Sequence, residues 1–155
     1  MDSRELFARA RSAADALERN KRAIDAMRES VASPHGARFG MRVSHGSNTD
    51  LSGPIAALVD REAAMRARSN ELAEAWLDAA WTAIDVVQVD FDDGAAMVLA
   101  HHYLFGETWA SCAGLLGRRS RNTPQTLAWA ALDWLDSVLD VSEDEAGHPV
   151  VSVVR

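Results

Sequence analysis

Three arginines lie close together in a short segment, and polar side chains follow directly after them. The arginines are Arg118, Arg119 and Arg121. Guanidinium groups at this spacing could contact phosphates on either side of a DNA groove, which positions a protein without reading sequence. At the start of the predicted helix that follows, Gln125 and Thr126 could reach base edges. The candidate DNA-binding residues are therefore Arg118, Arg119, Arg121, Asn122, Thr123, Gln125 and Thr126.

No comparable grouping favours catalysis or a metal ion. His101 and His102 are adjacent, and adjacent helical residues point about 100° apart, so we expect one to pack inside and the other to be solvated. His35 and His45 lack further ligands at the usual spacing. Cys112 lies in an apolar segment, which predicts a buried, inert thiol. The sequence predicts a protein that is not an enzyme, with no catalytic residues, no cofactor and no metal site.

The composition is that of an average folded protein with an acidic excess. Sixteen Lys and Arg face twenty-three Asp and Glu among 155 residues, for a net charge of -7. This argues against nucleic-acid binding through the charge of the whole molecule, but leaves room for a local basic patch. The single cysteine favours a reducing, cytoplasmic setting. No apolar run reaches the ~18 residues of a membrane span, so we expect no membrane contact.

The first segment, from about Asp2 to Val31, predicts one long helix. It is rich in strong helix formers, and Asp2 with Glu5 forms a plausible capping box. Its apolar residues alternate in steps of four and three if Asn20 is counted, as in a coiled-coil seam. Asn20 either specifies the register or merely lies at the edge of this stripe. The apolar positions are Leu6, Ala10, Ala13, Leu17, Ile24, Met27 and Val31.

A long Gly- and Ser-rich loop at 32–53 precedes a second long helix. Pro54 fits the first turn of that helix, with Asp50 or Ser52 near the cap. The helix should run to about residues 88–89 and pair with the first as an antiparallel hairpin, alone or within a homo-oligomer. Its many Asp and Glu side chains are most simply a solvated face. The predicted apolar face is Ile55, Leu58, Met65, Leu72, Trp76, Ala79 or Ala80, Ala83 or Ile84, and Val87.

Shorter helices should follow. Asp93 is the predicted cap of a helix at about 95–105, which Gly106 ends. Thr108 should cap a second helix that Gly117 ends.

A third helix should begin at Thr123 and Pro124 and run to about Leu139. After it, the residues at 142–145 are acidic and those at 150–154 are β-prone. Because a lone strand needs a partner, this tail should be disordered or pair with another chain.

The second and third of these helices could form a helix-turn-helix unit. Such a unit needs a small residue where its helices cross and a glycine at its tight turn, and Ala113 and Gly117 lie at those places. The third helix would then enter the major groove. However, Asp133 and Asp136 on it would repel phosphate if they faced DNA. Further expected inward residues are Leu115 and Leu116, and Trp109 against Tyr103 or Leu104.

Two segments, YLFGETW at 103–109 and CAGLLG at 112–117, resemble the end of sigma-factor region 4. The whole chain is similar in layout to small phage-encoded transcriptional regulators of the ArpU and RinA type and to sigma-like phage proteins. The opening of the second helix at 55–62, IAALVDRE, matches that layout. The resemblance implies a helix-turn-helix, binding to double-stranded DNA and control of late phage genes.

The sequence therefore predicts an all-α protein. Residues 1–90 form a coiled-coil-like helical hairpin with its loop at 32–53, residues 91–141 a sigma-region-4-like helix-turn-helix, and residues 142–155 a tail. We expect a DNA-binding phage or prophage transcriptional regulator that forms a homo-oligomer through the hairpin. Two alternatives stay open. One is a small terminase-like subunit for DNA packaging, which would assemble as a ring. The other is a protein-interaction module that contacts RNA polymerase and has little intrinsic DNA binding.

Overall fold

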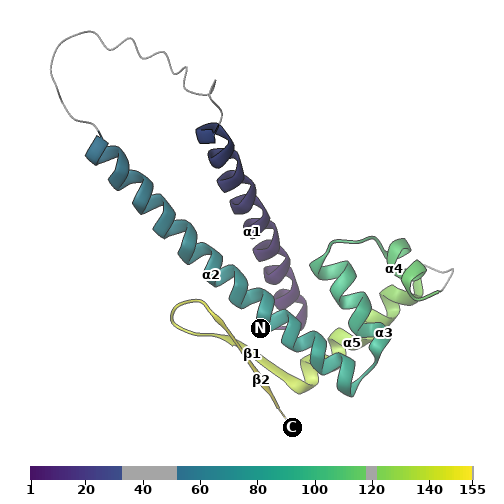
Figure 1. Ribbon diagram of the computed structural model, residues 1–155. Coiled ribbons are helices and arrows are strands. Elements are labelled where there is room, and N and C mark those ends of the chain that lie inside the picture. The colour runs from purple at the N-terminus through teal and green to yellow at the C-terminus, as the bar shows by residue number, and fades with distance from the viewer. Residues whose placement is uncertain (33–51, 118–121, 155) are drawn as a thin grey trace, which may run out of the picture. The chain divides into compact units, whose positions relative to one another are not determined.

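The computed structural model describes residues 1–32, 52–117 and 122–154, which are mostly helical (Figure 1). The predicted loop at 32–53 therefore lies largely outside the described residues. Arg118, Arg119 and Arg121 of the candidate turn lie wholly outside them. Within the described ranges, no helix has both the length and the apolar character that crossing a membrane requires. The elements are α1 (Ser3–Ala32), α2 (Ser52–Asp90), α3 (Asp93–Val98), the π-helix η1 (Leu99–Leu104), α4 (Trp109–Leu115), α5 (Asn122–Val138), β1 (Leu139–Glu143) and β2 (Pro149–Val153).

The chain divides into two compact units whose boundaries fall inside the two long helices. Unit 1 combines Met1–Ala16 with Leu72–Arg155, and unit 2 is Leu17–Glu71. The predicted domain boundary follows residue 90, where α2 ends, and therefore differs from both boundaries of these units. The first turns of α1 consequently belong with the short helices rather than with the rest of the predicted hairpin.

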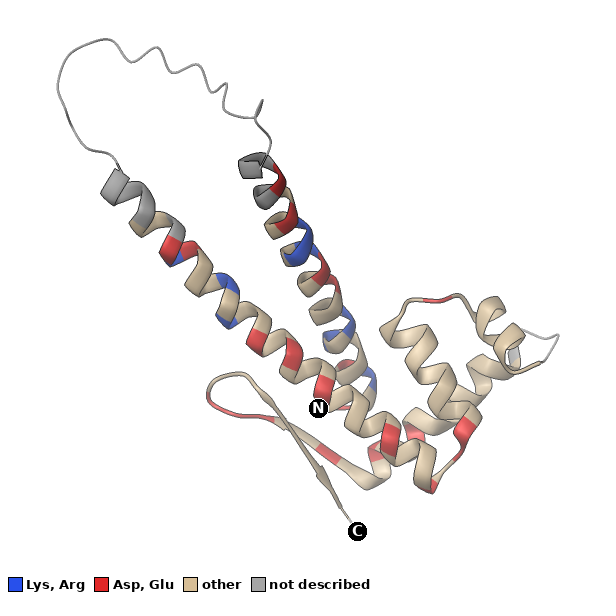
Figure 2. Cartoon of the chain, viewed as in Figure 1, with Lys and Arg blue, Asp and Glu red and all other residues tan. Residues whose placement is uncertain are grey.

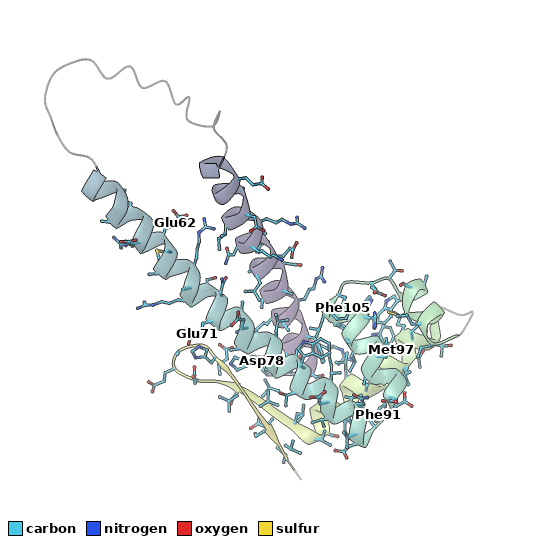
Figure 3. All side chains as sticks on the ribbon, viewed as in Figure 1. Glu62, Glu71, Asp78, Phe91, Met97 and Phe105 are labelled. Atoms are coloured by element: carbon cyan, nitrogen blue, oxygen red, sulfur yellow. The ribbon has the colours of Figure 1, made fainter. Side chains whose placement is uncertain are left out.

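The core of unit 1 draws on every helix within it. Leu6, Phe7, Leu99, Leu132 and Leu135 are fully buried. Burying a side chain of this size contributes about 1.5–3 kcal/mol. Side chains of these elements are drawn in Figure 3, where the labelled Phe91 belongs to a ring pair with Trp134. The predicted apolar positions that the structure buries are Leu6, Ala10, Ala13, Trp76, Ala79, Ala80, Ala83, Ile84 and Val87.

Polar contacts attach the first turn of α1 to α5. The backbone N–H of Ser3 donates to Asp136 Oδ1 at 2.6 Å, and the Ser3 hydroxyl donates to the Leu132 carbonyl at 3.1 Å. Beside them, Arg4 Nη2 donates to Asp133 Oδ1 at 2.8 Å. Because Ser3 is buried, its hydroxyl needs such a partner. These bonds fix where α1 begins relative to α5.

Half of the predicted capping box at the start of α1 is present. Asp2 Oδ1 accepts a hydrogen bond from the Glu5 N–H at 2.7 Å. The Glu5 carboxylate instead pairs with Arg9, whose guanidinium also pairs with Glu143 and lies 5.0 Å from the centroid of the Trp76 ring. Arg9 thereby connects α1, α2 and β1.

In unit 2, an amide pair joins the two long helices. Asn20 Nδ2 donates to Asn70 Oδ1 at 2.7 Å, and both residues are half-buried. This contact favours the specifying role for Asn20 over a place at the edge of the stripe. The predicted apolar face of α2 is uncovered in this unit, since Leu58 and Met65 are 67 % and 65 % exposed.

The helix after α2 differs from the prediction at its start and in its second half. The cap is Asp92, not Asp93: its backbone is extended, and its carboxylate accepts from the Ala95 N–H at 2.8 Å. From Leu99 the α-helix continues as the π-helix η1, whose last bond runs from the Phe105 N–H to the Ala100 carbonyl. Residue types alone do not distinguish this widened turn from an α-helix.

The chain is mostly helical as predicted, but it also has a two-stranded sheet, and the prediction for the tail was wrong. β2 pairs antiparallel with β1 of the same chain, with Val141 opposite Val151. The turn between the strands is tight because Asp144 accepts from the backbone N–H groups of Ala146 and His148, and Gly147 adopts a φ of 83°. These hydrogen bonds hold the pKa of Asp144 below its usual value.

Replacing Gly106 by alanine should lower the midpoint of thermal unfolding. Gly106 has a φ of +72°, and this left-handed conformation costs a residue with a Cβ roughly 1–2 kcal/mol. A Cβ there would also lie 2.7 Å from Arg11 Nη1. Gly114→Ala is the matched control: it lies in α4 with open space around it, so alanine should keep or raise stability, by up to about 1 kcal/mol. Equal losses in the two variants would contradict this account.

Candidate nucleic-acid interface

The helix α4 has the start and the end that its sequence predicts. The Thr108 side chain accepts a hydrogen bond from the Ser111 N–H at 3.2 Å, as an N-cap does. At the other end, Gly117 adopts a φ of 64°, which glycine tolerates best. Ala113 is buried, as a small residue at a helix crossing should be. α4 contacts α5, which begins five residues after Gly117.

The inward face of α4 is not the predicted one. Leu115 is 48 % exposed and Leu116 is half-buried, whereas Cys112 and Ala113 are buried. Cys112 is buried as predicted, and this burial raises the pKa of its thiol. Trp109 contacts Tyr103 as predicted, with ring centroids 6.2 Å apart.

The structure describes only some of the candidate DNA-binding residues. Arg118, Arg119 and Arg121 lie outside the described residues, and Asn122 begins α5 without a described side chain. Thr123 and Gln125 are half-buried, and Thr126 is exposed. α5 begins at Asn122, one residue before the predicted start at Thr123.

Pro124 is buried and lies in the first turn of α5, where a helix does not need its missing N–H.

The solvent-facing side of α5 changes character along its length. Its first half presents uncharged side chains, and its second half carries Asp133 and Asp136. Both acidic residues are engaged by the first turn of α1, through Arg4 and the Ser3 N–H. The charge of Asp133 is therefore paired within the chain, whereas Asp136 accepts a hydrogen bond and keeps its negative charge. The exposed residues of α5 are Thr126, Trp129, Ala130, Asp133, Asp136 and Ser137.

Arg4 is a residue that sequence reasoning missed. It is separated from Asp133 by 129 positions, and nothing in the local pattern of either segment marks the pair.

A hollow of about 620 Å³ lies beside the start of α5. The walls come from three elements: the start of α3, the end of α4 and the first half of α5. Thr123 and Thr126 line it from α5, and the Asp92 carboxylate, which caps α3, lies at its wall. The lining residues are Asp92, Gly94, Leu116, Thr123, Thr126, Leu127 and Ala130.

The two histidines do not divide into one packed and one solvated residue. Both are half-buried, and both contact Glu107: His101 Nδ1 lies 3.0 Å from its carboxylate and His102 Nδ1 lies 2.7 Å from its carbonyl oxygen. His102 also stacks on Trp109, with centroids 3.4 Å apart. The Ser111 hydroxyl donates to the same carboxylate at 2.9 Å. Because Glu107 lies between serine and histidine, this cluster lacks the hydrogen bond of a nucleophile to its base.

Among the residues that the structure describes, no three His, Cys, Asp or Glu side chains are placed to hold a metal ion. Comparison with protein-family models, curated proteins and solved structures finds no match for this chain. The likeness of residues 103–117 to sigma region 4 stays a prediction, and function has to be argued from the geometry of this chain.

The Glu107 cluster predicts a pH dependence of stability. Hydrogen bonds from His101 and Ser111 hold the pKa of Glu107 below its ordinary value of 4.5. A depressed pKa stabilises the fold above the ordinary value, and this stabilisation is lost as the pH falls through the lower folded value. The melting temperature of Glu107→Gln should therefore fall less between pH 5 and pH 3 than that of the unaltered protein. Glu145→Gln, at an exposed site, controls for the lost charge; an equal effect there would refute the assignment.

Proposed function

We propose that the protein binds double-stranded DNA through α4, the following turn and α5, used as a helix-turn-helix, and acts as a phage or prophage transcriptional regulator. One observation carries the proposal: a short capped helix with a buried alanine ends at a left-handed glycine, and a longer helix begins five residues later. A helix-turn-helix requires this local geometry. The side of α5 facing solvent in its first two turns is free of acidic groups.

The charge distribution supports binding at this place rather than elsewhere. With a net charge of -7, the chain as a whole repels DNA, so attraction has to be local. Three arginines precede α5 directly, and the N-terminus of a helix favours phosphate through its free N–H groups. Arg4 adds a positive charge at Asp133, where α5 would otherwise be acidic.

The predicted hairpin supplies the oligomerising part of the proposal. Leu58 and Met65 leave most of their side-chain surface in water within unit 2. A second copy of the chain would remove this apolar surface from water. For a regulator, the mass of the complex with DNA should correspond to one or two protein chains. A ring of chains would instead favour a packaging subunit.

Duplex DNA from the locus that encodes the protein should bind with an affinity that falls as salt rises, because phosphate contacts release counterions. Replacing Arg118, Arg119 and Arg121 together by alanine should abolish this binding, or weaken it by at least about tenfold. Fluorescence anisotropy at several salt concentrations measures both effects.

A matched control separates the place of the arginines from their charge. Replacing Arg61, Arg66 and Arg68 of α2 by alanine changes the net charge by the same amount. It should leave the affinity nearly unchanged. If both triple variants bind equally, or if the unaltered protein fails to bind even at low salt, α5 is not a DNA reader.

A second prediction concerns the pair that neutralises α5. Arg4→Ala removes the cation paired with the Asp133 carboxylate and should weaken DNA binding a few-fold, most at low salt. Adding Asp133→Asn should restore most of the affinity, since the double variant no longer carries the charge. Fluorescence anisotropy on the unaltered protein, the two single variants and the double variant measures the coupling between Arg4 and Asp133 in DNA binding.

The thermal stability of the same four proteins has to be measured as well. An exposed pair of this kind is worth at most about 1 kcal/mol, so all four proteins should stay folded at 25 °C. If Asp133→Asn fails to rescue Arg4→Ala while both are folded, then Asp133 does not face the DNA.

A further inference from the structure

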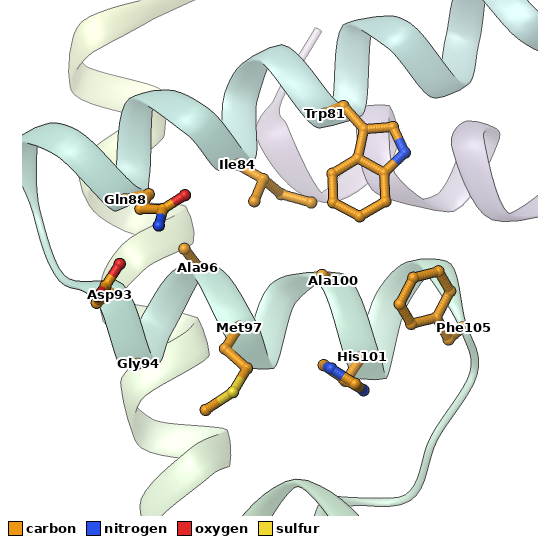
Figure 4. Close-up of a pocket in the computed structure, with 10 residues that line it drawn as sticks. All are labelled: Trp81, Ile84, Gln88, Asp93, Gly94, Ala96, Met97, Ala100, His101 and Phe105. Carbon is orange, nitrogen blue, oxygen red and sulfur yellow. The ribbon is translucent and has the colours of Figure 1, made fainter. Parts of the chain in front are cut away.

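An open groove runs along the last turns of α2, on the side that faces α3 and η1 (Figure 4). Its volume is about 440 Å³. Ile84 of α2 and Ala96, Met97 and Ala100 of the opposite helix supply its apolar middle. These residues belong to unit 1, and the groove shares only Gly94 with the residues that line the hollow beside α5.

The two ends of the groove differ in chemistry. At one end, the exposed rings of Trp81 and Phe105 have centroids 6.0 Å apart, and the imidazole of His101 meets Phe105 edge-on at 5.4 Å. Trp81 is 38 % exposed and Phe105 56 % exposed, so both keep surface available for a ligand. At the other end, Figure 4 shows Gln88 and Asp93 opposite one another.

The surroundings of the groove are acidic. From Leu72 to Gly117 the chain has no Lys or Arg, and Figure 2 shows only acidic charges on these elements. From the partner helix α1, Arg11 reaches the region, but its Nη1 donates to the Leu104 carbonyl at 2.7 Å and it pairs with Asp15. The acidic residues of the segment are Glu74, Asp78, Asp85, Asp90, Asp92, Asp93 and Glu107.

Length and charge together select the class of ligand. Trp81, Ile84 and Gln88 extend over two turns of α2, about 10 Å at 1.5 Å per residue. Two turns match the i, i+3 or i+4, and i+7 anchors by which an amphipathic helix docks in a groove. A ligand with acidic flanks would be repelled, whereas Lys or Arg beside the apolar anchors would meet Asp85 and Asp93.

We propose that this groove binds a basic amphipathic helical segment of a partner protein. The anchors of that segment contact Trp81, Met97 and Phe105, and its basic side chains face the carboxylates along α2. The inference does not rest on DNA binding, so failure of either one leaves the other standing.

The probe for the test is a 14-residue peptide of Leu and Lys with its leucines on one helical face. It is titrated into the ¹⁵N-labelled full chain, whose five tryptophans give indole N–H signals that NMR resolves. Trp81→Phe assigns the Trp81 signal. We expect a saturable shift of this signal, and weaker binding as salt rises.

Variants locate the binding surface. Trp81→Ala combined with Phe105→Ala should weaken peptide binding about tenfold, because exposed aromatic anchors dominate such contacts. Asp85→Asn combined with Asp93→Asn should weaken it a few-fold and reduce its salt dependence. Val89→Ala is the control: Val89 follows Gln88 on α2, is 80 % exposed and does not line the groove.

Several outcomes would overturn the proposal. No binding of the peptide is one, and undiminished binding to the aromatic double variant is another. Equal binding of a peptide with the same composition but scattered leucines would mean attraction by charge alone. Equal binding of a peptide with Glu in place of Lys would show that the acidic residues around the groove do not select a basic ligand. A Trp81 signal that shifts on dilution without peptide would show that a second copy of this chain occupies the groove.

Discussion

The attachment of the first turn of α1 to α5 is the constraint on which unit 1 depends. Ser3 uses both its N–H and its hydroxyl in this attachment, at Asp136 and Leu132. Burial makes these bonds expensive to lose, because an unpaired polar group inside the protein costs about 1–3 kcal/mol. With the helix start held there, Leu6 and Phe7 enter the core one turn later. Farther along α1, Arg11 holds the end of η1 at the Leu104 carbonyl.

Features set by neighbouring residues could be predicted from the sequence. The Thr108 cap, the left-handed Gly117 and the extents of α1 and α2 depend on residues a few positions apart, and the structure has them. Features set by distant residues could not. The exposure of Leu115, the Arg4–Asp133 pair and the pairing of β2 with β1 depend on which segments meet in space. The π-turn of η1 has no pattern of its own in the sequence.

The candidate interface and the acidic groove share one element. Gly94, in the first turn of α3, lines both the hollow beside α5 and the groove beside α2. A Cβ at this position would lie 3.0 Å from the Asp92 carboxylate and 3.2 Å from Leu116. The first turn of α3 therefore lies between the hollow of the proposed DNA-binding surface and the groove proposed for a basic helix.

The hairpin of β1 and β2 has a bearing on how the protein behaves at high concentration. Within the described residues it is a sheet of two strands, so each strand has one edge without a neighbouring strand. Such edges recruit strands from other molecules unless charge or proline interrupts them. β1 carries Asp140 and Glu143, whereas β2 has Pro149 at its start and then exposes Val150 and Val153. The free edge of β2 is thus the part of the described sheet to which a strand of another molecule would add most readily.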